Sequence, residues 1–264
     1  MMQIGQFIHF PYTFAGLAVG GLVGLTGVGG GSLMTPLLVL MFGIHPATAV
    51  GTDLLYAGLT KITGSAVHHR NGSIEWSVVR RLAAGSAPAA LATLALLAYW
   101  GVQSQRSGSA ISTILGYALL LTATVLLFRP WLVEKTRPAF ARLSERHIAA
   151  LTIVLGAALG VMVTLSSVGA GAIGVTVLLM LYPKMSTLRI VGTDIAHAVP
   201  LTLIAGAGHW AIGSVDWPML ISLLLGSIPG IMIASHFATR VPDRALRTLL
   251  AVALALVGAK LAFQ

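Results

Sequence analysis

The sequence predicts an all-α polytopic membrane protein made of two inverted structural repeats with broken helices. Its composition is the first reason: 56% of the residues are hydrophobic, 9% are charged and the mean hydropathy is +0.91, whereas soluble proteins carry about 25% charged residues. The second reason is that the hydrophobic residues occur in long blocks, as membrane-spanning helices require. The third reason is an internal duplication.

The second half of the chain repeats landmarks of the first half at a constant spacing of 141 residues, the separation between Asp53 and Asp194. The matched segments are Gly51-Thr52-Asp53 with Gly192-Thr193-Asp194, His68 with His209, residues 72–76 with 213–217, and residues 85–88 with 226–229. Chance rarely repeats glycine, aspartate, histidine and tryptophan together, so the sequence predicts two similar repeats. The predicted units are residues 1–128, a basic linker at 129–147, and residues 148–264.

Six apolar blocks have the length of one membrane span each, because a helix crosses the hydrocarbon core with about 20 residues. They cover residues 10–28, 77–100, 109–128, 148–166, 217–237 and 245–263. Two further blocks, 31–67 and 171–211, are too long for one span. Turn and proline residues interrupt them at 43–46 and 182–184, so each block predicts a shorter and a longer helix. The total is about 8–10 membrane segments.

The basic residues predict that the two repeats cross the bilayer in opposite directions. Lys and Arg accumulate in cytoplasmic loops, which places the loops at 68–81, 129–147 and 240–247 in the cytoplasm. The loop at 209–217 has no Lys or Arg and is expected outside, although its repeat equivalent at 68–76 is cytoplasmic. The repeats are therefore inverted, each with an odd number of crossings, and both termini are expected on the outer side.

Two glycine-rich interruptions are the best candidates for a solute site. Consecutive glycines let backbone N–H groups converge, and a helix that starts immediately afterwards points the positive end of its dipole at the same place. A small anion suits that environment. The expected substrate-binding residues are Thr26, Gly29, Gly30, Gly31, Ser32, Ser166, Ser167, Gly169, Ala170 and Gly171. Close helix packing is the interpretation that we favour for Gly16, Gly20 and Gly24.

Asp53 and Asp194 are ionisable residues inside membrane blocks, where a charge costs several kcal/mol unless it is paired or hydrated. Two interpretations remain open. Each aspartate, together with the preceding Thr52 or Thr193, caps a helix after a break, or it carries a coupling proton. His197 lies one turn after Asp194 on the same helical face, where an imidazole could relay that proton.

Lys61 has no basic counterpart in the second half. It either faces the interior, where it attracts an anion, or extends from the helix end to the membrane interface. His68 and His209 recur beside Trp76 and Trp217 at segment ends. Tryptophan is enriched at headgroup level, so these four residues predict an interfacial anchor, with gating as the alternative.

Several ligand classes lack a sequence signal. The histidines form no cluster on one helical face, so we predict no metal site. The glycines lack the Gly-x-x-x-x-Gly-Lys pattern of nucleotide-binding loops, and we predict no bound cofactor. The net charge of +9 lies in membrane-adjacent loops and not on a soluble basic domain, which argues against nucleic acid. The expected partners are a small anionic solute, the lipid bilayer and protons.

The chain resembles the sulfite exporter TauE/SafE family over nearly its whole length, including its two-fold repeat and its central basic linker. The segments that carry the resemblance are Gly24–Ser32 with Pro36, Ala49–Asp53, Val168–Gly171 and Val191–Asp194. The resemblance implies a secondary transporter in the cytoplasmic (inner) membrane, and not an enzyme. It also implies that the cargo is a small sulfur-containing or organic anion, such as sulfite or a sulfonate.

Two other functions remain as alternatives. A passive anion channel could use the same amide-lined constriction without alternating access. An intramembrane aspartyl hydrolase needs two aspartates that share a proton, but both aspartates here stand in Gly-Thr-Asp, unlike the two different motifs of such enzymes. Coupling to a proton gradient would separate a transporter from a channel.

Overall fold

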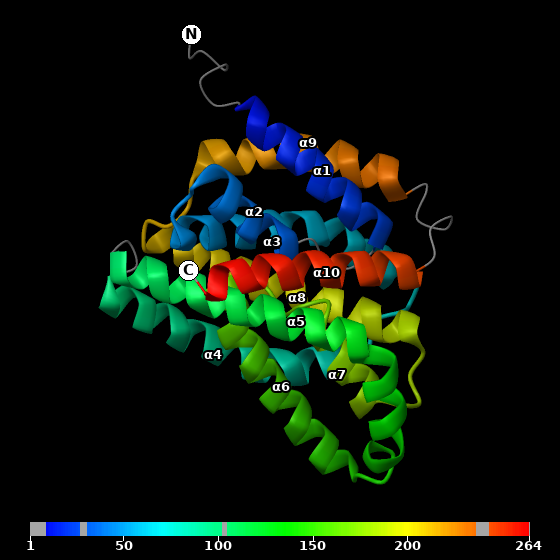
Figure 1. Ribbon diagram of the computed structural model, residues 1–264. Helices are drawn as coiled ribbons and strands as arrows, with labels where there is room; N and C mark the ends of the chain where they lie inside the picture. Colours follow the sequence, from blue (N-terminus) through cyan, green and yellow to red (C-terminus); the bar gives the residue numbers. More distant parts are fainter. Residues whose placement is uncertain (1–8, 27–30, 102–104, 236–242, 264) are drawn as a thin grey trace.

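The computed structural model describes residues 9–26, 31–101, 105–235 and 243–263, and these residues form ten α-helices with no β-strand among them. In chain order the helices are α1 (Phe10–Thr26), α2 (Gly31–Phe42), α3 (Pro46–Arg70), α4 (Trp76–Trp100), α5 (Gln105–Phe140), α6 (Glu145–Ser166), α7 (Ile173–Leu181), α8 (Thr187–Ala211), α9 (Trp217–Ser235) and α10 (Asp243–Ala262). Figure 1 shows α1 and α9 at one edge of the stack and α4 and α6 at the other. The predicted all-α class is confirmed.

Both long apolar blocks are broken where the sequence predicts. The first forms α2 and α3, and the second forms α7 and α8. Gly43 ends the first short helix with φ +63°, a conformation that favours glycine. The side chain of His45 accepts from the N–H of Ala47 and so caps α3. Pro46 stands at the first position of the helix, where proline is common. Each repeat therefore contains one short helix, α2 or α7, next to its glycine-rich segment.

Length and composition place the helices in a bilayer. Among the described residues, five helices are long and apolar enough to cross a membrane, namely those at Trp76–Trp100, Gly108–Phe140, Glu145–Ser166, Thr187–Ala211 and Trp217–Ala234. Large apolar side chains cover the outside, as on α1, α9 and α10, where Phe10, Met232 and Leu256 are 64–73% exposed. Such a surface suits contact with lipid. The chain is an integral, multi-pass membrane protein.

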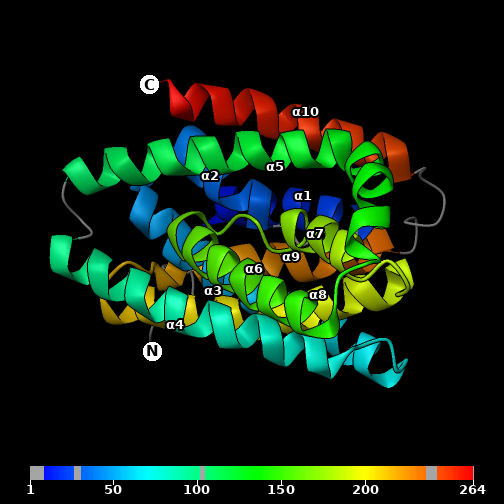
Figure 2. The same cartoon turned by 90° about the horizontal axis from the view of Figure 1, so that it is seen from below.

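The first helix of each repeat packs against the fourth helix of the other repeat. α1 lies on α9, and α6 lies on α4 (Figures 1 and 2). In the first pair Gly20 lies against Ser227, and in the second Gly160 lies against Ser86. A Cβ atom at Gly20 would be 2.6 Å from the carbonyl oxygen of Ser227, so a side chain does not fit. The packing interpretation of the α1 glycines is confirmed.

The long helices α3 and α8 cross at the centre of the molecule in antiparallel orientation. Gly51, near the start of α3, lies against His209, near the end of α8. Gly192, near the start of α8, lies against His68, near the end of α3. When each residue is replaced by its equivalent in the other repeat, one contact becomes the other. The two halves are therefore related by an approximate two-fold axis, as inverted repeats require.

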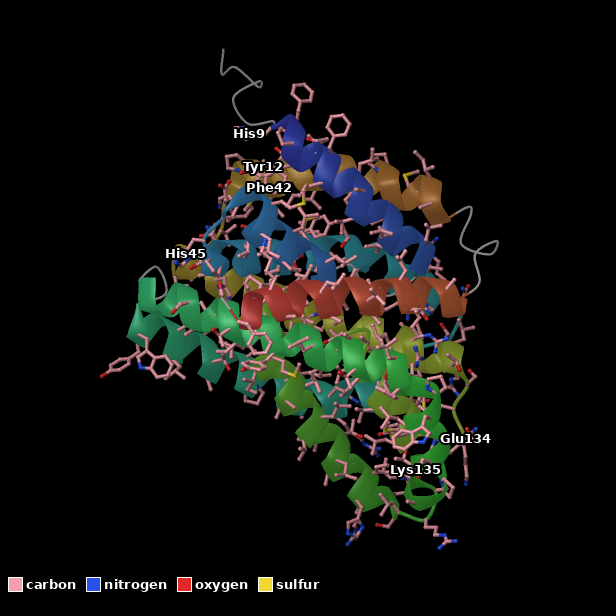
Figure 3. All side chains as sticks on the ribbon, in the orientation of Figure 1. His9, Tyr12, Phe42, His45, Glu134 and Lys135 are labelled. Carbon is pink, nitrogen blue, oxygen red and sulfur yellow. The ribbon has the colours of Figure 1, made fainter. Side chains whose placement is uncertain are left out.

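Equivalent helices of the two repeats run in opposite directions (Figures 1 and 2). α1 begins on the side of the molecule where α10 ends, and the turn between α5 and α6 lies on the opposite side. α1 and α2 form a hairpin that is closed by the rings of Tyr12 and Phe42, whose centroids are 5.0 Å apart (Figure 3). Each half thus begins on one side of the molecule and ends on the other, which agrees with the odd number of crossings expected from the charge pattern. The side of the membrane on which the termini lie stays a prediction.

Most of the linker at 129–147 is helical. α5 continues past Arg129 to Phe140, and α6 begins at Glu145. α5 bends in its last turns (Figure 1), where Pro130 and Pro138 stand inside the helix. A proline removes a helical hydrogen bond and bends the helix without ending it. Composition did not indicate this extension, because its charged residues and its two prolines are typical of a loop between spans.

Candidate functional site

The start of the short helix α2 lies against a buried aspartate of α3. Asp53 is fully buried, and its Oδ2 accepts hydrogen bonds from the backbone N–H of Thr35 at 3.2 Å and from the Thr35 hydroxyl at 2.5 Å. Asp53 stands inside α3 and does not cap its own helix. The capping interpretation is corrected accordingly: the carboxyl group binds the first turns of the preceding short helix.

Asp194 repeats this arrangement at the second break. It is 1% exposed, lies against Gly174 in the first turn of α7, and faces the backbone N–H of Gly171. In the described part of the chain, neither of its oxygens has a hydrogen-bond partner of normal geometry, and neither does Oδ1 of Asp53. The Ser167 hydroxyl of the second repeat faces Asp53 of the first. Both carboxyl groups thus lie at the starts of short helices and retain acceptor capacity.

Lys61 contributes a positive charge to the same region. Its side chain is half-buried on α3, and its ammonium group interacts electrostatically with Asp194 and Asp53. No Lys61 ion pair closer than 4.0 Å is found among the described residues. Attraction of an anion by Lys61 therefore stays a prediction. The sequence shows a single such cation, because Thr202 stands at the equivalent position of α8.

The backbone of the second break is shaped by residues with positive φ. Ser167 has φ +57°, Gly169 has +120° and Gly171 has +101°. These conformations turn the chain sharply between α6 and α7 and direct successive amides to one side. The N–H groups of Ile173 and Gly174 both donate to the carbonyl of Gly169, so the turn leads directly into α7.

Ser166 has a role that differs from the expected one. Its hydroxyl donates to the carbonyl oxygen of Met162 at 2.7 Å and accepts from the N–H of Val168 at 3.2 Å. The hydroxyl thus satisfies the end of α6 and is not directed at a solute. The N–H of Ser167 is also used, because it donates to Val163. The expected anion donors of this break are reduced to the Ser167 hydroxyl and the amides of Gly169, Ala170 and Gly171.

The first break lies largely outside the described residues. Gly29 and Gly30 belong to the segment 27–30, which the structure does not describe, and Gly31 begins α2. Thr26 ends α1 and Ser32 stands in the first turn of α2, while the positions of their side chains are likewise not described. Their proposed part in binding an anion stays a prediction. Their place between α1 and α2 corresponds to that of the second break between α6 and α7.

Thr52 and Thr193 hold the loops of the opposite repeat. The hydroxyl oxygen of Thr52 accepts from the N–H of Asp216 at 3.0 Å, and that of Thr193 accepts from the N–H of Glu75 at 2.9 Å. The two bonds join equivalent residues of the two repeats. On one side only, Glu75 also forms an ion pair with Arg189 at 2.8 Å. The threonines were expected at helix breaks, whereas their observed contacts fasten the two repeats to each other.

A second pair of equivalent contacts joins the repeats deeper in the interior. The hydroxyl of Tyr56 donates to Ser227 at 2.7 Å, and Nε2 of His197 lies 2.8 Å from the hydroxyl of Ser86. His197 thus bonds to α4, and its Nδ1 has no partner in the described part of the chain. Ser86 and Ser227 were not among the residues predicted to be functional. Their recurrence in the duplicated segments 85–88 and 226–229 was the available signal.

The residues predicted to anchor the protein at the interface divide into two groups. Trp76 and Trp217 are 49% and 45% exposed, as a side chain at headgroup level would be. His209 is instead 1% exposed, and its Nε2 bonds to the carbonyl of Thr164 at 3.0 Å. His68 is half-buried and bonds to Ser73. The histidines lie inside the repeat interface, because Gly192 and Gly51 have no side chain and leave room for His68 and His209.

The region between the two breaks brings together hydrogen-bond donors and carboxyl groups. It combines amide and hydroxyl donors, one ammonium group and two buried aspartates. Within the described ranges, no three His, Asp or Glu side chains lie close enough to share a metal ion. A solute with acceptor oxygens could bind the donors, and a proton could bind either carboxyl group.

The family model described as Sulfite exporter TauE/SafE matches residues 12–261, a range that contains both breaks and both aspartates. The chain belongs to the sulfite exporter TauE/SafE family. In Bacillus subtilis, the probable membrane transporter protein YjnA is 42% identical to it over 247 residues, which cover 93% of this chain and 96% of YjnA. The probable membrane transporter protein YdhB is 25% identical over the same shares. No solved structure matches the chain.

This TauE/SafE protein is therefore a membrane transporter by family and by the names of its relatives. A probable membrane transporter protein of Xylella fastidiosa (strain 9a5c), 25% identical over 86% of this chain and 83% of its own length, supports the same class. In transporters with inverted repeats, the solute site lies where the repeats meet and where helices are broken. The region around Asp53, Asp194 and Lys61 meets both conditions in this TauE/SafE chain.

Proposed function

We propose that this chain is a secondary transporter that exports a small sulfur-containing or organic anion, such as sulfite or a sulfonate, together with a proton. The anion binds at the repeat interface between the starts of α2 and α7. Rocking of one repeat against the other exposes the site to each side in turn. The observation that carries the proposal is the symmetric placement of Asp53 and Asp194 at the starts of these two short helices, with Lys61 beside them.

A coupling proton follows from competition for the same donors. A carboxylate that faces the start of a short helix occupies the amide groups that an anionic solute needs. A buried charge without full hydrogen bonding is costly, so a proton on Asp53 or Asp194 releases those donors at little cost. The anion then binds to the freed amides and to Lys61. Anion and proton are therefore expected to bind in the same state of the transporter.

For a divalent anion, the direction of transport follows from charge. A divalent anion that moves with one proton still carries a net negative charge outward, and an inside-negative potential favours this movement by about 2.3 kcal/mol per charge per 100 mV. The expected location is the cytoplasmic membrane. The end of the molecule with the α5–α6 turn is expected in the cytoplasm, because it carries the basic residues at 129–147.

The test is transport in proteoliposomes with labelled sulfite, a sulfonate and a carboxylate, each with and without an imposed pH gradient. We expect accumulation of at least one anion against its gradient, driven by protons. Asp53→Asn and Asp194→Asn are expected to remove the response to the pH gradient, because an amide cannot take up the proton. Asp216→Asn is the matched control, since the side chain of Asp216 lies in a loop and accepts from the N–H of Met219, a bond that the asparagine oxygen can keep.

The outcomes separate the proposed transporter from the alternatives. Flux that never exceeds equilibration would indicate a passive anion channel. A pH response that is unchanged in both aspartate variants would contradict proton carriage by these residues. Absence of flux for every anion would contradict transport of these solutes and would leave the intramembrane hydrolase as the remaining alternative.

A further inference from the structure

A large basic cavity lies at the end of the molecule that carries the α5–α6 turn. Its volume is about 790 Å³, within the range of small-molecule sites. Four of its lining residues are cationic and one is acidic: Arg129, Arg137, Lys184, Arg247 and Glu134. Figure 3 shows Glu134 at this corner of the molecule. The lining thus carries a clear excess of positive charge.

The walls of the cavity are held in place by specific contacts. α5 continues beyond Pro130 and forms one wall. The guanidinium group of Arg137 donates to the carbonyl oxygen of Pro183 at 2.5 Å, which fastens α5 to the loop between α7 and α8. Tyr182 in that loop bonds to Thr152 of α6 at 2.8 Å. The cavity is therefore part of the folded structure and not a gap between free loops.

The cavity is connected to the aspartate region through α7 and Arg129. Leu179 of α7 lines the cavity, and Gly174 of the same helix touches Asp194. Five residues of helix separate these two contacts, a rise of about 7.5 Å. Arg129 lines the cavity and interacts electrostatically with Asp194. The lining of the cavity thus reaches α7 at a residue about one and a half helical turns from the start of that helix.

We propose that this basic cavity is the inner vestibule of the transport pathway, in which a small divalent oxyanion collects before it moves to the site at Asp194 and Lys61. The proposal rests on the proposed function. A recess lined by charges of one sign raises the local concentration of the opposite ion, and the attraction grows with the charge of the anion. The vestibule therefore favours divalent over monovalent anions and supplies the site from the linker side.

The test compares Lys184→Gln with Arg146→Gln in proteoliposomes. Lys184 lines the cavity, whereas Arg146 is an exposed residue at the same end that does not line it. For divalent sulfite supplied from the linker side, we expect KM to rise about three- to tenfold in Lys184→Gln with kcat unchanged. The difference is expected to vanish near 1 M salt, where the screening length is about 3 Å. Equal KM values in the two variants, or a change in kcat alone, would overturn the proposal.

Two further measurements distinguish the vestibule from a lipid-binding site and from failure of the proposed function. If the KM effect appears only in liposomes with anionic lipids, the cavity holds a lipid headgroup and the vestibule is refuted. If the wild type carries no anion, the proposed function fails, and binding is measured instead as stabilisation of the purified protein by sulfite. Stabilisation lost in Lys184→Glu but kept in Arg146→Glu would support the anion site on its own, while equal stabilisation would overturn it.

Discussion

Replacement of Lys61 by glutamine is expected to lower the transport rate at least about 100-fold. The attraction between an ammonium group and an anion about 4 Å away is about 4 kcal/mol at an effective dielectric constant of about 20, and 1.36 kcal/mol corresponds to a tenfold change in rate. Lys61 is half-buried, so screening by solvent reduces this attraction. It is the cation that interacts with both Asp53 and Asp194 from within α3. Without it, the site repels the anion that the amides attract.

Two controls make this result specific. Lys260→Gln removes the same charge from an exposed position in the last turn of α10 and should transport normally. Lys61→Arg keeps the charge and should retain a measurable part of the rate. Folding is checked separately by the elution profile of each purified variant. A well-folded Lys61→Gln protein with the wild-type rate would show that Lys61 has no part in binding the anion.

The features that recur in both halves could be predicted from the sequence. The duplicated Gly-Thr-Asp, His and Gly-Ser motifs predicted two repeats, and each motif proved to lie at a contact between them. The breaks at 43–46 and 182–184 were predictable because glycine and proline act locally on the backbone. The relative direction of the repeats was predictable because Lys and Arg are unevenly distributed between loops.

The partners of these residues could not be predicted from the sequence. Thr52 binds a loop of the other repeat, and Asp53 binds a helix that precedes its own. The first contact depends on how the two repeats pack together and the second on how α2 folds back on α3, and no local pattern encodes either. The helical extension of α5 to Phe140 was missed for a different reason. Its charged residues are typical of a loop between spans, and its two prolines, Pro130 and Pro138, resemble helix ends in a sequence.

Replacement of Gly20 by alanine is expected to destabilise the protein, whereas replacement of its neighbour Gly21 is expected to stabilise it. Alanine favours a helix over glycine by about 1 kcal/mol, so both changes have the same local effect. At Gly20 the added Cβ would be 2.6 Å from the carbonyl oxygen of Ser227, and at Gly21 it would meet nothing within 4 Å. Overpacking costs about 1–3 kcal/mol, and more where backbone must move.

The measurement is the melting temperature of each variant in detergent. We expect Gly20→Ala to melt about 5 °C below the wild type, since 1 kcal/mol corresponds to roughly 2–4 °C for a chain of this size. Gly21→Ala should melt at or slightly above the wild-type temperature. Gly160→Ala should behave like Gly20→Ala, because a Cβ there would be 2.9 Å from the Cα of Ser86. Shifts of the same sign at Gly20 and Gly21 would contradict the packing of α1 on α9, because only that packing distinguishes these two adjacent glycines of α1.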